Sequence, residues 1–67
     1  MGITLKAARV NKNLSQVQAA DMLHTSVNVV SNWERGITYP NAIQLKDITE
    51  LYGVKYDDIN FLPKNNA

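Results

Sequence analysis

The sequence predicts an all-α fold, a compact domain of five short helices around one core. Apolar residues recur at the spacing of a helix, and residues that cap helix starts, such as Ser15, Ser26 and Asn41, precede those stretches. No segment alternates convincingly between apolar and polar residues with the period of two that a strand requires. The chain has 67 residues, the size of one domain, and a domain this small buries only about 60% of the surface of its unfolded chain.

The first two predicted helices follow from the residues at their starts. Thr4 is the expected N-cap of a helix near residues 4–12, whose apolar face holds two residues, Leu5 and Ala8. Ser15 opens the second helix, and Gln18 completes a capping box in which each side chain satisfies a free backbone N–H. The second helix is expected to place its apolar residues on one face, at Val17, Ala20 and Leu23.

The third predicted helix begins after Ser26 and ends at Gly36, the residue type best suited to a left-handed helix end. Its apolar face is formed by two residues, Val30 and Trp33. Only residues 24–26 separate it from the second helix, so the two helices must pack closely and need small residues where they meet. Such residues lie in the middle of the second helix, at Ala19 and Ala20.

The fourth predicted helix begins after Asn41 and ends at Gly53. Its apolar residues are Ile43, Leu45, Ile48, Leu51 and Tyr52. A short fifth helix is predicted within residues 55–62, where two carboxylates in the first turn complement the helix dipole, those of Asp57 and Asp58.

Composition and charge exclude several classes of protein. The chain has no cysteine and one histidine, His24, so it lacks the residues for disulfides or a metal cluster. It has no glycine-rich phosphate loop, and its acids are typical of helix starts and surfaces, so we expect no enzyme, cofactor or small-molecule ligand. Without a long apolar run or a signal peptide it is expected to be cytoplasmic. One domain should span residues 1–62, followed by a disordered tail at residues 63–67.

Several motifs occur together and in order along the chain. Arg9 lies in the first predicted helix, LSQVQAADML occupies residues 14–23, and WERG closes the third helix at residues 33–36. A short loop then ends at Pro40, and LYGV follows at residues 51–54. In this order and spacing the sequence resembles the helix-turn-helix of the phage-repressor and Cro family, the XRE-like transcription regulators. The resemblance implies a lambda-repressor-like fold, double-stranded DNA as partner, and a regulator that is expected to be a repressor.

The resemblance also implies that the second helix of the motif lies in the DNA major groove, with its N-terminal residues facing base edges. Carried over by position, the base-contacting residues are Val27, Asn28, Ser31 and Asn32. Their chemistry fits, because asparagine can pair with adenine through two hydrogen bonds, serine can donate or accept, and an exposed valine can contact a thymine methyl. The alternative is that small polar residues simply cover a solvated helix face.

Contacts to DNA phosphates are expected from polar groups around that helix, at Gln16, Arg35, Thr38, Tyr39 and Asn41. Gln16 matches a family position that hydrogen-bonds a phosphate beside the free N–H groups at a helix start, and its alternative role is that of a local cap. For Tyr39 the alternative is packing of the ring against the core, with the hydroxyl in water.

The resemblance assigns Arg9 and Glu34 a structural role instead. In the family, residues at these positions form a partly buried ion pair that ties the first helix to the recognition helix. His24 departs from the family pattern, because it stands in the turn where glycine is usual; histidine tolerates a left-handed backbone, but at some cost. Lys55 also departs, since a helix cap is expected there.

Two functions compete at this point. The first is DNA binding by a transcription regulator, and the second is a protein–protein module, such as an antitoxin or bridging factor with weak DNA affinity, which a net charge of only +1 keeps open. If DNA is the partner, basic residues should cluster around the recognition helix, namely Lys6, Lys12 and Arg35. A homodimer is expected on DNA, since one short helix reads few base pairs. Its candidate contact surface is Ile59, Phe61 and Leu62, whose alternative role is to complete the monomer's own core.

Overall fold

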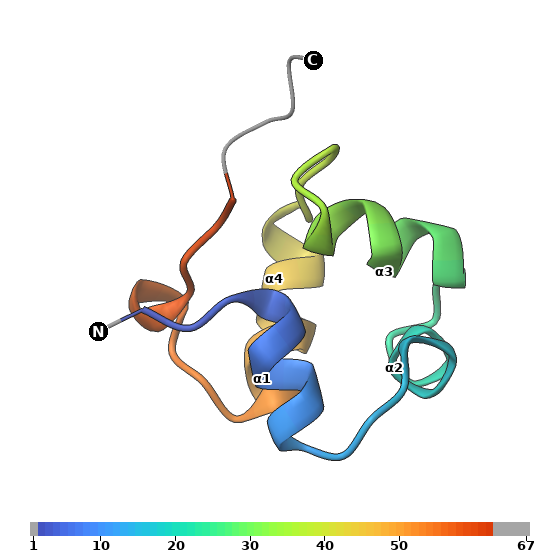
Figure 1. Cartoon of the computed structure of the whole chain (residues 1–67), viewed down its shortest axis with the longest axis horizontal. Helices are drawn as coiled ribbons and strands as arrows, with labels where there is room; N and C mark the ends of the chain where they lie inside the picture. The colour runs from blue at the N-terminus through green and yellow to red at the C-terminus, as the bar shows by residue number, and fades with distance from the viewer. Residues whose placement is uncertain (1, 63–67) are drawn as a thin grey trace.

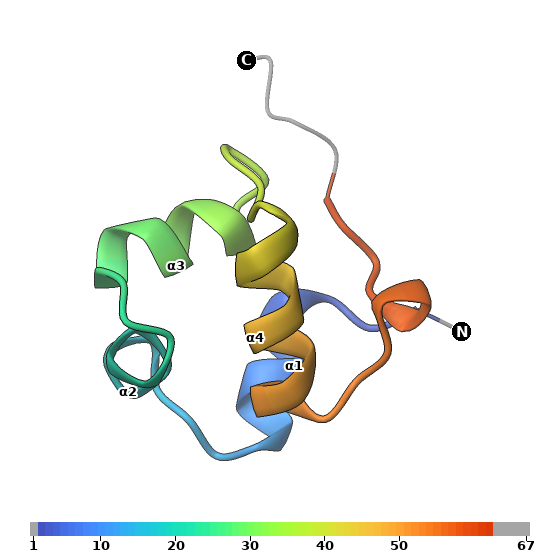
Figure 2. The same ribbon diagram turned by 180° about the vertical axis from the view of Figure 1, so that it is seen from behind.

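The protein folds into four α-helices followed by one 3-10 turn, as a computed structural model that describes residues 2–62 shows (Figure 1). The elements in chain order are α1 (Leu5–Asn11), α2 (Gln16–Met22), α3 (Val27–Glu34), α4 (Ala42–Tyr52) and the 3-10 turn η1 (Tyr56–Asp58). Helices α1 and α4 lie side by side, and α2 and α3 pack on one flank of that pair (Figures 1 and 2). The all-α class is confirmed. The tail predicted at residues 63–67 lies outside the described residues.

The predicted fifth helix is wrong in kind, since η1 is a single turn of three residues. Lys55, at its start, supplies no side-chain cap. After the turn the backbone becomes extended and Ile59 forms an isolated parallel bridge with Ile3. The N–H of Ile3 donates to the carbonyl of Asp58 at 2.7 Å, and the N–H of Asn60 donates to the carbonyl of Ile3 at 2.8 Å. Pairing with the N-terminal segment therefore uses backbone groups that a longer helix would need for itself.

The four α-helices start where capping residues predict. Thr4, Ser15, Ser26 and Asn41 each accept a hydrogen bond, through a side-chain oxygen, from the backbone N–H three residues later. The capping box at Ser15 is present, and a second box joins Asn41 to Gln44. These bonds satisfy N–H groups that the first turn of a helix otherwise leaves without partners.

The ends of the α-helices share one feature, a residue with positive φ. These residues are Asn13, His24, Gly36 and Gly53. At His24 φ is 56°, and the following N–H, that of Thr25, donates to the carbonyl of Ala20 at 2.9 Å. This is the Schellman pattern, which satisfies the last carbonyls of α2 and turns the chain toward α3. His24 thus takes the left-handed conformation that its position in the turn predicts.

The core lies where the four helices meet, and it is built from Leu5, Ala8, Ala19, Ala20, Val30, Trp33, Ile48, Tyr52 and Ile59. Ala19 is fully buried, and its small side chain lets α2 approach α3 closely. The predicted apolar face of α2 was wrong at Val17, which is 66% exposed. The buried face of this helix is centred on the two alanines instead, because close packing against α3 leaves no room there for a larger side chain. No helix among residues 2–62 is long and apolar enough to cross a membrane.

An ion pair between Arg9 and Glu34 links α1 to the end of α3. Arg9 donates from Nε to Glu34 Oε2 at 2.7 Å and from Nη2 to Oε1 at 3.2 Å. A third bond runs from Arg9 Nη1 to the carbonyl of Leu14 at 2.7 Å. The two side chains are only 8% and 5% exposed. Hydrogen bonding to Glu34 raises the pKa of Arg9 above its ordinary value, so the guanidinium of Arg9 keeps its charge.

We expect Arg9→Ala to lower the free energy of unfolding by about 3 kcal/mol, because it would leave the carboxylate of Glu34 buried without its charged partner. Urea denaturation of the wild type and the variant measures this difference. Lys6→Ala, an exposed change on the same helix, is the matched control and should shift stability by less than about 0.5 kcal/mol. Equal stability of Arg9→Ala and wild type would contradict the structural role of the pair.

The buried hydroxyl of Tyr52 should make the stability of the protein fall at alkaline pH. The side chain of Tyr52 is almost completely buried, and burial, followed by the negative charge of Glu34, raises its pKa from 10.0 to about 12, although Arg9 opposes the shift. A raised pKa means that the folded state holds the proton more tightly than the unfolded state. The stabilisation is therefore complete below pH 10 and is lost as pH rises through 12, by about 2 to 3 kcal/mol in total.

The measurement is urea denaturation at several pH values between 9 and 12, for wild type and for Tyr52→Phe. We expect the stability of the wild type to fall more steeply than that of the variant, because phenylalanine has no proton to lose. Parallel curves for the two proteins would show that Tyr52 does not carry the pH dependence.

Candidate nucleic-acid interface

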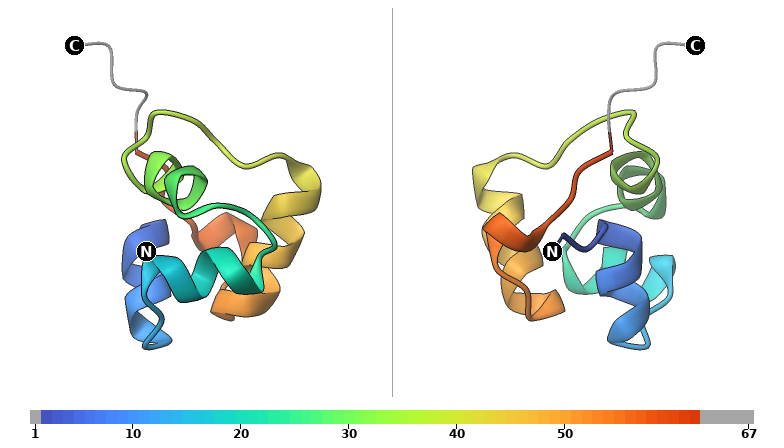
Figure 3. Two further views of the ribbon diagram at one scale, coloured as in Figure 1. Left: turned by 90° about the vertical axis from the view of Figure 1, so that its right-hand side faces the viewer. Right: turned by 60° about the vertical axis from the view of Figure 1, so that its left-hand side comes forward.

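Helices α2 and α3 form a compact two-helix unit. In the left view of Figure 3, α2 runs across the view while α3 is seen close to end-on, so their axes cross at a steep angle. The connection is short, and its turn is made by the left-handed His24. Val30 and Trp33 are buried and hold α3 against the rest of the domain. The remaining face of α3 is left on the outside of the molecule.

The four residues predicted to contact bases lie on this helix. Val27 and Asn28, in its first turn, are exposed, and Ser31 and Asn32 are half-buried further along. Val29, between them in sequence, packs against the core cluster and belongs to the inner face. The outward face therefore combines one aliphatic side chain with hydroxyl and amide groups, and it has no charged side chain before Glu34.

The end of α3 leads directly into the loop that joins it to α4. Gly36, with φ of 75°, ends the helix, and the N–H of Ile37 donates to the carbonyl of Asn32 at 3.0 Å. Arg35 and Thr38 are exposed on either side of this turn. Their donor groups are thus presented close to the C-terminal end of α3.

Three of the residues predicted to contact phosphates already have partners within the chain. Gln16 donates from Nε2 to Glu34 Oε1 at 3.1 Å. Asn41 accepts the N–H of Gln44 through Oδ1 at 2.8 Å, as the cap of α4. The hydroxyl of Tyr39 donates to the carbonyl of Leu62 at 2.8 Å, and its ring meets that of Phe61 edge to face at a centroid distance of 6.1 Å. Among the described residues the two amide hydrogens of Asn41 have no acceptor, whereas the single hydroxyl hydrogen of Tyr39 is used in its bond to Leu62.

Lys12, one of the three basic residues expected around α3, lies elsewhere. The side chain of Lys12 lies beside Gly53, because a Cβ atom placed on that glycine would come within 3.1 Å of Lys12 Nζ. Gly53 is the C-cap of α4, at the opposite end of that helix from the loop after α3 (Figure 1). Arg35 alone of the expected cluster follows α3 directly.

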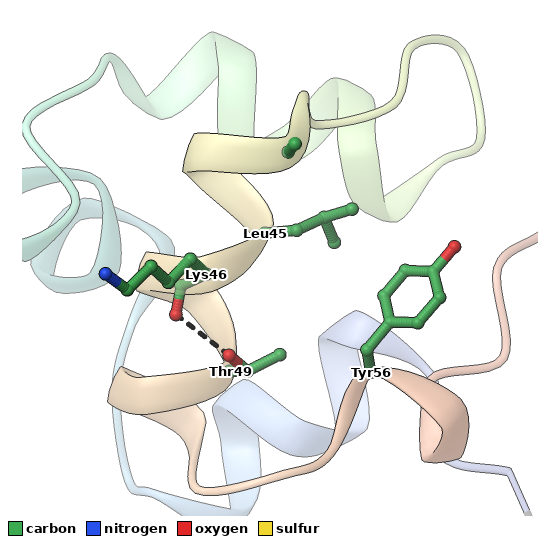
Figure 4. Close-up of a pocket in the computed structure, with 5 residues that line it drawn as sticks. Leu45, Lys46, Thr49 and Tyr56 are labelled. Carbon is green, nitrogen blue, oxygen red and sulfur yellow. Dashed lines mark hydrogen bonds between the residues drawn. The ribbon is translucent and has the colours of Figure 1, made fainter.

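A second surface, which the sequence did not predict, lies on α4 and η1. A hollow of about 360 Å³ is lined by Ala42, Leu45, Lys46, Thr49 and Tyr56. Figure 4 shows the side chains of Leu45 and Tyr56 facing one another across it. A neighbouring hollow of about 280 Å³ shares these two residues and extends to Tyr39, Pro40 and Phe61. The two hollows thus form one continuous apolar groove, called here the α4 groove.

Helix α4 also carries Ile43, which is 75% exposed although the sequence placed it among the core residues of the helix. The spacing of the apolar residues already indicated this exposure. Leu45, Ile48 and Tyr52 recur on one face of the helix, whereas Ile43, two positions before Leu45, lies on another face. The predicted dimer surface also changes. Ile59 is buried in the monomer's core, Phe61 is half-buried, and Leu62 is 41% exposed.

Comparison with known proteins agrees with this architecture. A family model described as helix-turn-helix matches residues 5–59. The chain is also similar to the HTH-type transcriptional activator BcrR of Enterococcus faecalis, with 40% identity over 55 residues, which covers 82% of this chain and 27% of that protein. The chain thus spans about a quarter of the length of this relative. The chain belongs to the helix-turn-helix family, of the phage-repressor and Cro (XRE) type.

Proposed function

We propose that this chain binds double-stranded DNA sequence-specifically as the DNA-binding domain of a cytoplasmic transcription regulator, with α3 in the major groove. The observation that carries the proposal is the division of α3 into two faces. Val30 and Trp33 are buried, while Val27 and Asn28 project from the first turn with no role in the core. A helix fixed in this way can present its N-terminal residues to base edges. Membership of the family and the similarity to a transcriptional activator support the same function.

The outward side chains of α3 suit direct reading of bases. Asn28 and Asn32 can each pair with the N6 and N7 atoms of adenine, which is the asparagine contact that the major groove favours. Val27 can contact a thymine methyl, and burial of its exposed side chain against that methyl removes apolar surface from water. Ser31 can donate or accept. We assign these four residues to base recognition.

Phosphate contacts would position the domain. Arg35 and Thr38 are exposed beside the end of α3, and within residues 2–62 the amide hydrogens of Asn41 have no acceptor while its oxygen caps α4. We assign phosphate contacts to these three residues and to Gln16. Tyr39 is the weakest candidate, because its hydroxyl hydrogen would have to leave the carbonyl of Leu62 before it could serve a phosphate.

A second copy of this chain is the proposed occupant of the α4 groove. Ile43 projects from the same helix that lines the hollow, so a two-fold axis would let each copy insert this residue into the other. Paired half-sites lie about 34 Å apart, and a dimer of this domain would present one α3 to each of them. A homodimer would also double the number of bases read.

A protein–protein module, such as an antitoxin or bridging factor, is the second candidate function. It is favoured by the position of Lys12, which lies away from α3, and by the net charge of only +1. As for the direction of regulation, repression is the expectation from sequence, whereas the similar protein is an activator. Both outcomes are compatible with the same domain, because the site that α3 binds relative to the promoter decides which one occurs.

Selection of bound fragments from a random duplex pool tests the proposed function. We expect the wild type to enrich one motif with two-fold symmetry. Asn28→Ala should weaken binding to it by about 1 to 3 kcal/mol and relax the preference at one base pair in each half-site. Asn11→Ala, an exposed asparagine at the end of α1, is the matched control and should keep both affinity and motif.

Absence of any enriched motif for the wild type would favour the protein–protein module. If Asn28→Ala enriches the same motif as the wild type, the base contact assigned to Asn28 is contradicted. The other assigned contacts are not affected by that result.

Sedimentation velocity with a duplex that holds both half-sites tests the dimer. We expect two copies per duplex, bound cooperatively, and a loss of cooperativity for Ile43→Asn because the polar side chain would be buried without a partner. Val10→Asn, at a valine that is also exposed (51%) but lies on α1, should keep cooperative binding. Two copies that bind independently in the wild type would rule out the α4 groove as a dimer contact.

A further inference from the structure

The carboxylate of Glu34 accepts hydrogen bonds from two side chains, those of Arg9 and Gln16. The stability of the fold accounts for the bond from Arg9 only. Oε2 accepts from Arg9 Nε at 2.7 Å, and Oε1 accepts from Arg9 Nη2 at 3.2 Å. Oε1 also accepts from Gln16 Nε2 at 3.1 Å. Gln16 is the first residue of α2 and is only half-buried, so its side chain reaches from the surface toward the buried pair. The network therefore connects α1 and α3 with an exposed edge of α2.

We propose that Glu34 is a positioning residue for DNA binding, which acts by orienting the side-chain amide of Gln16 toward a phosphate. The proposal rests on the proposed function. A carboxylate can only accept hydrogen bonds, so the amide nitrogen of Gln16 must face Glu34 and the amide cannot turn over without losing the bond. One amide hydrogen is used in this contact. The second hydrogen is held in a fixed direction and is available for a phosphate oxygen.

Orientation before binding has a thermodynamic advantage. An exposed glutamine side chain loses rotamer freedom when a ligand fixes it, and this loss weakens the complex. The bond to Glu34 orders the side chain of Gln16 when the protein folds. Less rotamer freedom is then left to lose when the phosphate binds. The same contact made by an unrestrained glutamine would be weaker.

Charge explains why a carboxylate can serve this purpose beside DNA. An unpaired carboxylate would repel a nearby phosphate, but Glu34 is neutralised by Arg9 through two hydrogen bonds. The pair presents an acceptor to Gln16 without presenting a net negative charge to the DNA. Arg9 is thus part of the positioning unit although its own side chain is almost completely buried.

The test compares binding of one selected duplex by four proteins, the wild type, Gln16→Ala, Arg9→Met/Glu34→Met, and the triple variant. Replacement of both members of a buried ion pair by apolar residues of similar volume often preserves folding, and it leaves the net charge unchanged. We expect Gln16→Ala to weaken binding about fivefold in the wild-type background, the size of one lost hydrogen bond. The Met/Met background should already show most of that loss, and Gln16→Ala should then add less than about twofold.

The salt dependence of binding separates positioning from a general effect of charge. A neutral amide releases no counterions, so the slope of affinity against salt should stay the same in all four proteins. Arg35→Ala is the control, and it should reduce the slope by about 0.9 if this residue contacts a phosphate. A changed slope in the Met/Met background would overturn the positioning role.

An equal effect of Gln16→Ala in the two backgrounds, or wild-type affinity in the Met/Met protein, would overturn the inference while DNA binding itself stands. Failure of the wild type to bind any duplex would overturn both. If the Met/Met protein does not fold, NMR of the wild type provides the second test. We expect the resonances of the two side-chain hydrogens of Gln16 to be shifted from those of a free glutamine before DNA is added. Resonances equal to those of a free glutamine would contradict the bond to Glu34 in solution.

Discussion

The buried ion pair between Arg9 and Glu34 is the interaction on which the rest of the structure depends. Three of the four helices meet through it, because Arg9 belongs to α1, Glu34 ends α3, and Gln16 at the start of α2 donates to the same carboxylate. Arg9 also holds the chain between α1 and α2 through the carbonyl of Leu14. Such a pair is costly to desolvate, and it is stable here because nearly every donor and acceptor in it has a partner. It fixes the place of α3 relative to the domain.

Because the ion pair holds α3 in place, the two faces of this helix can have different functions. Its inner face is apolar and buried, while its outer face holds hydroxyl, amide and methyl groups in place of charges. Uncharged groups of this kind distinguish bases by the pattern of donors and acceptors, whereas attraction to phosphates is the same for every sequence. Low charge at α3 is therefore consistent with selective binding of DNA, provided that Arg35 and the polar groups near it supply the contacts to the backbone. The α4 groove lies on a different element and leaves the outer face of α3 free.

Features that depend on neighbours in the sequence could be predicted, and those that depend on distant segments could not. The four N-caps and the left-handed turn at His24 are set within a few residues, so the helix starts and the two-helix motif followed from the sequence. The early end of η1 depends on pairing with Ile3, more than 50 residues away, which no local pattern reveals. The hydrogen bond of Tyr39 to Leu62 and the position of Lys12 beside Gly53 also depend on tertiary packing.

The central claim is that the outer face of α3 binds DNA, and an NMR titration of the labelled protein with a short random duplex at low salt tests it most directly. Sequence-independent binding at low salt makes knowledge of the operator unnecessary. The account predicts that backbone and side-chain shifts concentrate at Val27, Asn28 and Ser31, with further shifts at Gln16 and Arg35. Shifts that concentrate on Ile43 and Tyr56 in the α4 groove, or no shifts at all, would contradict it.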